Sequence, residues 1–251
     1  MIFNTIYTIW LRNVKRYIRS KSRIIGSLAQ PLFFLIILGF GLNSAVNVSG
    51  LGENYVKFLI PGIVAMTVMF TSIFSGIQII WDKLFGFLKE TLIAPISRTS
   101  IMIGQTLGGA TTALLQGIII LILSLIIGSV FSNVTGFLIA LVFMTLIGIA
   151  FTSLGVAIAS RMEDMQGFQL IMNFVIFPLF FLSGALFPLQ NAPIILKTLA
   201  HLNPLTYGIE GIRYGLLGIS QISVLTSFLV LVLFSIIMIM IGAYSFKRIK
   251  I

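Results

Sequence analysis

The sequence predicts an all-α integral membrane protein with six transmembrane helices. Of its 251 residues, 58% are hydrophobic and only 9% are charged, whereas a soluble domain carries about 25% charged residues. The charges are also spaced so that five long stretches contain none: 24–52, 58–81, 99–160, 165–196 and 214–246. A helix needs about 20 apolar residues to cross a bilayer. Each stretch is therefore long enough for at least one span, and too little polar surface remains to cover a water-soluble globule.

The third stretch is long enough for two spans, because residues 128–136 in its middle are rich in the turn-forming residues glycine, serine and asparagine. Lipid offers the peptide backbone no hydrogen-bond partner, so each span must be a helix. We expect the six spans near residues 24–43, 58–81, 101–129, 135–159, 167–187 and 222–246.

The basic residues set the expected orientation, because they favour the cytoplasmic side of a membrane. With the amino terminus inside, only Lys57, Lys197 and Arg213 of the sixteen basic residues fall in outer segments. Both termini of this multi-pass protein are therefore expected in the cytoplasm, in the cell membrane. The net charge of +10 gathers at the ends of apolar segments, where it would meet anionic lipid headgroups. We therefore expect the lipid bilayer as a partner, and no nucleic acid.

Residues 1–23 have the pattern of an amphipathic helix that lies on the inner membrane surface. One stripe is apolar and a second is basic, at helical spacing. A plain basic flank that fixes topology, with no other role, is an equally good interpretation. The apolar stripe is Ile2, Ile6, Ile9, Trp10, Val14 and Tyr17, and the basic stripe is Arg12, Arg16, Arg19 and Arg23.

Two loops contain more than a connection requires. The inner loop 82–94 mixes both charges with Leu84, Phe85 and other apolar residues, which predicts a short helix with one apolar face. The outer segment 188–221 holds three of the seven prolines but stays apolar. It is too short and interrupted for two spans. We expect two short helices that dip back into the outer leaflet and are broken at Asn203-Pro204.

Three segments resemble one known family. These are DKLFGFLKETLIAPISR at 82–98, FPLFFLSGALFP at 177–188 and LNPLTY at 202–207. They are similar, in order and spacing, to the inner loop, fifth span and outer segment of ABC type-2 exporter permeases, especially the daunorubicin-resistance-type multidrug branch. The likeness covers nearly the whole chain.

The resemblance implies that residues 82–94 form a coupling helix on a separate ATP-binding cassette ATPase, and that two permease chains, expected as a homodimer, pair with two ATPase chains. We call residues 82–94 the coupling segment. It also implies re-entrant helices between the fifth and sixth spans, where Asn203, Pro204, Tyr207, Glu210 and Arg213 are the site residues. The expected ATPase contacts are Phe85, Phe87, Leu88, Lys89, Glu90 and Leu92.

Several polar residues fall inside or beside the predicted spans. Interhelical hydrogen bonds are the simpler interpretation, and a substrate path lined by them is the functional one. Glu210 and Arg213 are spaced to pair on one helical face, either as a structural link or as a gate. Asp164 is placed to cap the fifth span. The candidate path residues are Gln78, Gln105, Gln116 and Asn173.

The sequence shows no catalytic site. It contains no cysteine and one histidine, so a metal site is not expected, and it lacks the glycine-rich phosphate loop that binds ATP. ATP and Mg²⁺ are therefore expected in the partner ATPase, and no cofactor in this chain. The predicted function is export of a hydrophobic or amphipathic, drug-like or lipid-like substrate. The alternatives are an ion-coupled carrier or channel without an ATPase and, less well supported, a lipid-modifying membrane enzyme.

Overall fold

The computed structural model describes residues 2–41, 55–93, 95–126 and 133–249, and throughout these ranges it contains helices and turns but no β-strand. The helices are α1 (Ile2–Arg19), α2 (Lys21–Gly41), α3 (Tyr55–Ser75), α4 (Ile77–Leu84), α5 (Phe87–Ile93), α6 (Arg98–Ile126), α7 (Val134–Arg161), α8 (Met165–Ile171), the π-helical turn η1 (Met172–Ile176), α9 (Phe177–Phe181), the 3-10 turn η2 (Leu189–Asn191), α10 (Ile194–Leu202), α11 (Pro204–Leu217) and α12 (Val224–Lys247).

The predicted all-α membrane fold is confirmed. Within the described ranges, five helical segments are long and apolar enough to cross a membrane: Ile24–Gly41, Tyr55–Leu84, Arg98–Ile126, Val134–Arg161 and Val224–Lys247. The fifth predicted span, 167–187, corresponds to a shorter apolar rod, Met165–Phe181, made of α8, η1 and α9. The rod is shorter than predicted because the chain turns after Phe181, where Gly184 adopts a left-handed φ of 72°.

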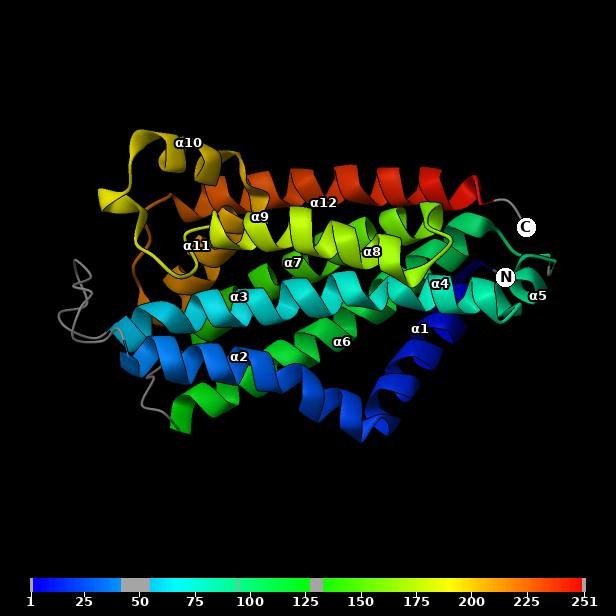
Figure 1. Cartoon of the computed structure of the whole chain (residues 1–251), viewed down its shortest axis with the longest axis horizontal. Helices are drawn as coiled ribbons and strands as arrows, with labels where there is room; N and C mark the ends of the chain where they lie inside the picture. The colour runs from blue at the N-terminus through cyan, green and yellow to red at the C-terminus, as the bar shows by residue number, and fades with distance from the viewer. Residues whose placement is uncertain (1, 42–54, 94, 127–132, 250–251) are drawn as a thin grey trace.

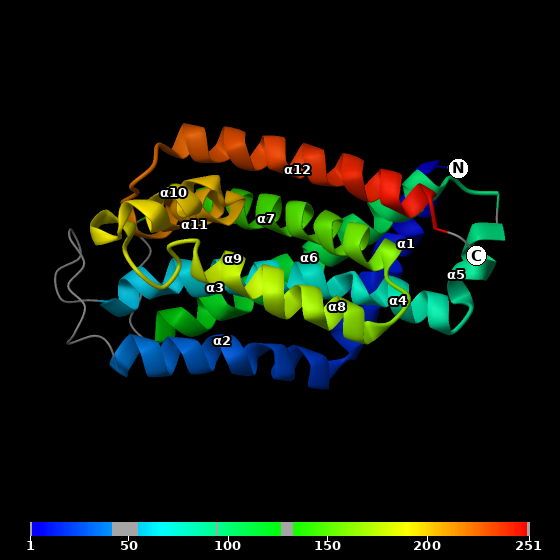
Figure 2. The same ribbon diagram turned by 45° about the horizontal axis from the view of Figure 1, so that its top comes forward.

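The long helices run side by side along the longest axis of the molecule (Figure 1). Helix α7 is central and packs against α12, α11, α3 and α6, while α1 crosses the bundle obliquely and packs on α6. Figures 1 and 2 place the start of α1, the end of α12 and helix α5 at one end of the bundle. Helices α10 and α11 lie at the opposite end. The two ends of the bundle are therefore built from different elements.

The helix pair α3–α4 and α7 touch backbone to backbone at Gly155. A Cβ atom added to Gly155 would lie 2.5 Å from the carbonyl oxygen of Ile73, and one added to Gly76 would lie 2.4 Å from the carbonyl oxygen of Gly155. Real Cβ atoms do not approach an oxygen so closely. Small residues on both helices are what allow this approach.

Replacing Gly155 by alanine is therefore expected to force α3 and α7 apart. We expect a loss of about 1–3 kcal/mol, typical of an overpacked core, measured as a lower melting temperature of the purified chain in detergent. Gly26→Ala is the matched control, because nothing lies within 4 Å of a Cβ at that helical position. A Gly155→Ala variant as stable as Gly26→Ala would show that the close crossing is absent.

The predicted boundaries were wrong at two inner segments. Residues 82–94 do not form one helix. Residues 82–84 belong to the last turn of α4, which ends at Leu84. Gly86 then takes a left-handed φ of 78°, and α5 begins only at Phe87. A glycine in this conformation ends a helix. The helix predicted over residues 1–23 also ends earlier, at Arg19. Ser20 is not helical, and α2 starts at Lys21.

Two local predictions agree with the structure. The outer helices α10 and α11 are separated at Asn203, whose Oδ1 accepts a hydrogen bond from the backbone N–H of Leu205 at 3.0 Å, and Pro204 occupies the first turn of α11. Asp164 caps α8, with Oδ1 accepting from the N–H of Gly167 at 2.6 Å. How deeply α10 and α11 enter a membrane stays a prediction.

Candidate transport cavity and coupling segment

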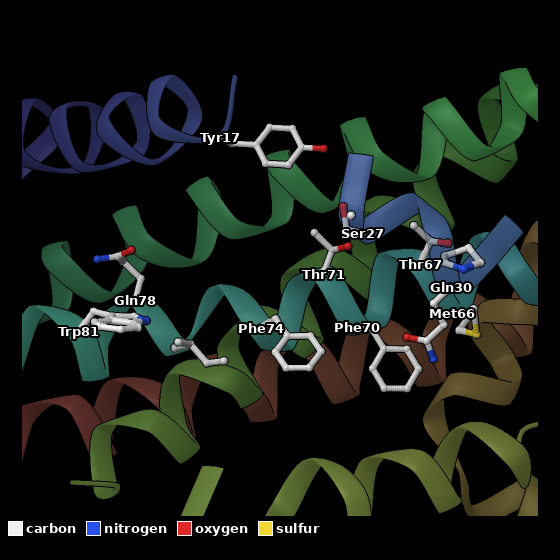
Figure 3. Close-up of a pocket in the computed structure, with 13 residues that line it drawn as sticks. Tyr17, Ser27, Gln30, Met66, Thr67, Phe70, Thr71, Phe74, Gln78 and Trp81 are labelled. Carbon is white, nitrogen blue, oxygen red and sulfur yellow. The ribbon is translucent and has the colours of Figure 1, made fainter. Parts of the chain in front are cut away.

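A cavity of 510 Å³ lies between α2 and one face of the α3–α4 pair (Figure 3). Aromatic or aliphatic side chains and side chains with hydroxyl or amide groups line it in equal numbers, together with Gly26. None of the described residues that line it carries a charge. The apolar members are Pro31, Met66, Phe70, Phe74, Ile77 and Trp81, and the polar members are Tyr17, Ser27, Gln30, Thr67, Thr71 and Gln78.

Two phenylalanines join this cavity to the rod Met165–Phe181. The ring of Phe70 lies 4.8 Å from that of Phe177, and the ring of Phe74 lies 6.4 Å from that of Phe168, measured between centroids. Such offset aromatic pairs add about 0.5–1.5 kcal/mol beyond the area they bury. The cavity wall and the rod are therefore one packed unit.

Of the four predicted path residues, the structure brings only Gln78 to the cavity, where its Nε2 also donates to Asp82 Oδ1 at 2.6 Å. Gln105 accepts a hydrogen bond from Asn13, and Gln116 accepts one from the hydroxyl of Tyr17. These two glutamines thus hold α1 against α6, which is the interhelical alternative weighed for them.

The fourth predicted path residue, Asn173, lies elsewhere. It is exposed on the rod, where its Oδ1 accepts from Gln169 Nε2 at 3.3 Å. Both side chains lie on the same helical face, four residues apart. They form a polar strip on an otherwise apolar segment, away from the residues that line the cavity.

Helix α1 is a packed part of the bundle. Its indole Trp10 Nε1 donates to Thr111 Oγ1 at 3.0 Å, and Ile9 is buried against Gly104 of α6. A Cβ added to Gly104 would lie 2.9 Å from the Ile9 Cβ. The apolar residues Ile2 and Phe3 at its start remain 66% and 77% exposed. Only part of the predicted apolar stripe therefore stays free for a membrane surface.

The coupling segment presents apolar side chains at its end of the bundle. Phe85 is 75% exposed and stacks on Trp81, with ring centroids 5.4 Å apart, and Ile93 is 80% exposed. Among the other predicted ATPase contacts, Phe87 is 42% exposed, Lys89 and Glu90 are exposed, and Leu92 is half-buried.

One predicted ATPase contact is wrong. Leu88 is only 6% exposed and belongs to the hydrophobic core of the permease itself, so it cannot reach into a partner. The reason is the break at Gly86: α5 starts afresh there, and its helical phase directs Leu88 inward.

Lys83, at the beginning of the coupling segment, was missed by sequence reasoning. Its Nζ donates to three backbone carbonyls at the end of α7: Ala159 at 3.1 Å, Ser160 at 2.8 Å and Met162 at 2.9 Å. The last carbonyls of a helix lack intrahelical partners and carry the negative end of the helix dipole. An ammonium group is well suited to both, so Lys83 fastens the coupling segment to α7.

Two further basic residues fasten the same region. Arg98, at the start of α6, donates to the carbonyl of Lys247, the last residue of α12, at 2.6 Å and to that of Ile249, just beyond the helix, at 3.1 Å. Arg12 of α1 pairs with Asp82 at 3.1 Å, and its guanidinium lies 4.8 Å from the ring centre of Phe87. The only sign of these contacts in the sequence was a basic residue at each edge of an inner loop. The preference of basic residues for the cytoplasmic side explains that pattern equally well.

Lys83→Met is expected to destabilise the purified permease by about 1–3 kcal/mol, because charge-assisted bonds to three carbonyls are lost together. The measurement is the melting temperature in detergent. Lys89→Met is the control, since Lys89 is exposed on α5 and makes none of the contacts to α7 described above. Equal melting temperatures for the two variants would mean that Lys83 does not anchor α7.

At the other end of the bundle, Glu210 and Arg213 form an ion pair with both side chains almost fully buried. Arg213 Nη2 also donates to the carbonyl of Gly184 at 3.1 Å, and its guanidinium lies 4.2 Å from the ring centre of Phe58 in α3. The second oxygen of Glu210 accepts from the backbone N–H groups before α12. These bonds favour the structural interpretation of the pair.

The remaining predicted outer residues also serve packing. Asn203 Nδ2 donates to the carbonyl of Leu179 at 2.6 Å, and the Tyr207 hydroxyl donates to the carbonyl of His201 at 2.8 Å. Together with Glu210 and Arg213, they tie α10 and α11 to the rod and to α3. The site residues predicted in segment 188–221 thus cluster at one end of the bundle, around α10 and α11.

With this geometry in place, comparisons with known proteins decide the family. The ABC-2 type transporter family matches residues 4–217. The chain belongs to the ABC-2 type transporter family. It is therefore the membrane permease subunit of an ABC transporter, as the resemblance of its inner loop and outer segment implied.

This ABC-2 permease is similar to known proteins from several organisms. It is 35% identical over 199 residues to the putative transport permease ycf38 of Porphyra purpurea, covering 78% of this chain and 68% of the relative. It is 32% identical to nodulation protein J of Rhizobium leguminosarum bv. trifolii (84% and 80% covered) and 28% identical to the inner membrane transport permease YadH of Escherichia coli K12 (90% and 88%). None of these three names refers to daunorubicin resistance, so that branch stays a prediction.

Proposed function

We propose that this permease moves a hydrophobic or amphipathic substrate outward, using ATP hydrolysed by a separate ABC ATPase that holds the nucleotide and Mg²⁺. Two copies would form a homodimer in the cell membrane with both termini in the cytoplasm. The observation that carries the proposal is the coupling segment, which offers exposed apolar side chains to a partner while it is fastened to helices of the bundle.

The contacts suggest how force would pass from the ATPase into the membrane. Movement of α5 would pull on Asp82 and Lys83 at the end of α4, and Lys83 is bonded directly to the end of α7. Helix α7 is the central helix of the bundle. A displacement at the coupling segment therefore reaches the core without passing through a flexible loop. The ATPase supplies the energy, and the permease supplies two alternative packings of its helices.

Phe85→Asp combined with Ile93→Asp is expected to reduce co-purification of the ATPase at least tenfold, because two charges would enter an apolar contact and lose water there. The measurement is a pull-down of the two subunits expressed together. The double change leaves the core residue Leu88 untouched, so the permease should still insert and purify.

Phe187→Asp is the matched control, because Phe187 is 53% exposed but follows the rod in the connection from α9 to α10, and α10 lies at the opposite end of the bundle from α5 (Figure 1). It should leave co-purification unchanged. If the ATPase is still recovered in full with the double variant, or is lost equally with Phe187→Asp, α5 is not the contact.

The polar strip on the rod supports pairing of two chains. Gln169 and Asn173 are exposed in the single chain, and exposed polar side chains are costly against lipid. A second copy, or a path between two copies, would cover them. Because Asn173 lies on one exposed face of the rod, a two-fold axis near it would bring the two Asn173 residues together.

The chain contains no cysteine, so a single introduced cysteine tests this directly. Asn173→Cys in membranes is expected to give a disulfide-linked dimer on mild oxidation, seen as a band of doubled mass on a non-reducing gel. Leu229→Cys serves as control, since Leu229 is 57% exposed on α12, away from the rod. Failure of Asn173→Cys to cross-link above the level of Leu229→Cys would contradict a dimer centred on the rod.

A further inference from the structure

We infer that the cavity between α2 and α3–α4 binds an amphiphile with an anionic headgroup: the apolar chain enters the cavity, and basic side chains at the α1–α2 junction hold the head. This inference rests on the proposed function and narrows its substrate class. Three features of the molecule support it: the charge at the junction, the continuity of the junction with the cavity, and the chemistry of the cavity wall.

The junction of α1 and α2 carries cationic side chains, most of which have no carboxylate partner among the residues that the structure describes. An open depression there is lined by Lys15, Arg16, Arg19 and Lys21, together with Arg12 and two serines. Among the described residues, Arg12 pairs with Asp82, whereas the other four form no salt bridge. Guanidinium and ammonium groups that converge in this way favour phosphate or carboxylate ligands.

This basic depression adjoins the cavity. Arg16 lines the depression and also a small polar pocket that includes Tyr17, Gln78 and Thr112. Tyr17 and Gln78 in turn line the large cavity, and Figure 3 shows them on opposite sides of it, on α1 and α4. A charged head at Arg16 would therefore lie next to the cavity that receives its chain.

The cavity itself is built for an uncharged chain. Its residues on α3–α4 run from Met66 to Trp81, which is about 22 Å of helix at a rise of 1.5 Å per residue. Phe70 and Phe74 form the middle of this wall. With no charged side chain among its lining residues, the wall offers no ion pair to offset the cost of bringing an ionised group inside. The charged head and the apolar chain of the amphiphile would thus bind to two adjoining surfaces, the basic depression and the cavity.

Two sources could supply this chemistry. One is a transported amphiphile whose chain occupies the cavity, which is our inference. The other is an ordinary anionic lipid of the bilayer that rests its head on the basic junction while its chains stay in the membrane. The two differ in whether the cavity is filled, and Trp81 in the cavity wall reports on that.

The test uses the purified full-length permease, without ATPase, in nanodiscs of phosphatidylcholine. Oleoyl lysophosphatidic acid and oleoyl lysophosphatidylcholine share one chain and differ in the head. Titration of each is followed by tryptophan fluorescence, and Trp81→Phe identifies the part of the signal that comes from the cavity. We expect the anionic probe to bind at least tenfold more tightly than the zwitterionic one.

Two sets of variants separate head from chain. Arg16→Gln with Arg19→Gln should bring the affinity for the anionic probe down to that for the zwitterionic probe. Arg161→Gln is the control for charge, since Arg161 is the exposed last residue of α7 and is not among the residues that line the junction. Thr71→Phe, which fills the cavity, should weaken binding of both probes at least tenfold. Gel filtration of each variant establishes that it is folded.

Equal affinity for the two probes, or an unchanged affinity in the double arginine variant, would overturn the inference. Binding of the anionic probe that persists in Thr71→Phe would also overturn it, in favour of an ordinary surface lipid. Since no ATPase is present, these outcomes are independent of the co-purification test: loss of the docking proposal would leave probe binding unchanged, and loss of probe binding would leave docking intact.

Discussion

The constraint that shapes this protein is that lipid offers no hydrogen bonds, so polar groups must find partners inside the chain. Helix interiors meet it by themselves, but helix ends and polar side chains do not. The structure answers with bonds between elements far apart in the sequence. Tyr17 and Asn13 of α1 meet glutamines of α6, and Glu210 and Arg213 meet each other and the backbone around them. Much of the tertiary organisation follows from these pairings.

The same constraint determines how helices are joined at the end of the bundle that carries α5. The carbonyls at the ends of α7 and α12 need donors, and they receive them from Lys83 and Arg98, which flank α5. The bonds that complete two long helices are thus also the attachments of the coupling segment. In the proposed mechanism, the side chains that complete these helix ends would also receive the force from the ATPase.

Sequence reasoning recovered what depends on one helix at a time. Composition and charge spacing located the spans, and local capping chemistry located the break at Asn203 and the cap at Asp164. It failed where a contact between helices decides. The inward direction of Leu88 depends on the left-handed turn at Gly86, and the roles of Gln105 and Gln116 depend on where α1 packs. The aromatic wall of Phe70 and Phe74 is likewise indistinguishable, in sequence, from an ordinary core stripe.

The contact of Gly155 with α3 has a geometric consequence. Backbones that touch without side chains between them have no rotamers to rearrange, so relative motion there must be a turning or sliding of whole helices. Helix α7 extends about 9 Å from Gly155 to Arg161 but about 32 Å from Gly155 back to Val134. If α7 turns as a rigid lever about this fulcrum, a shift of its short arm near Lys83 is enlarged about threefold at the far tip, where Gly136 abuts Gly215 of α11.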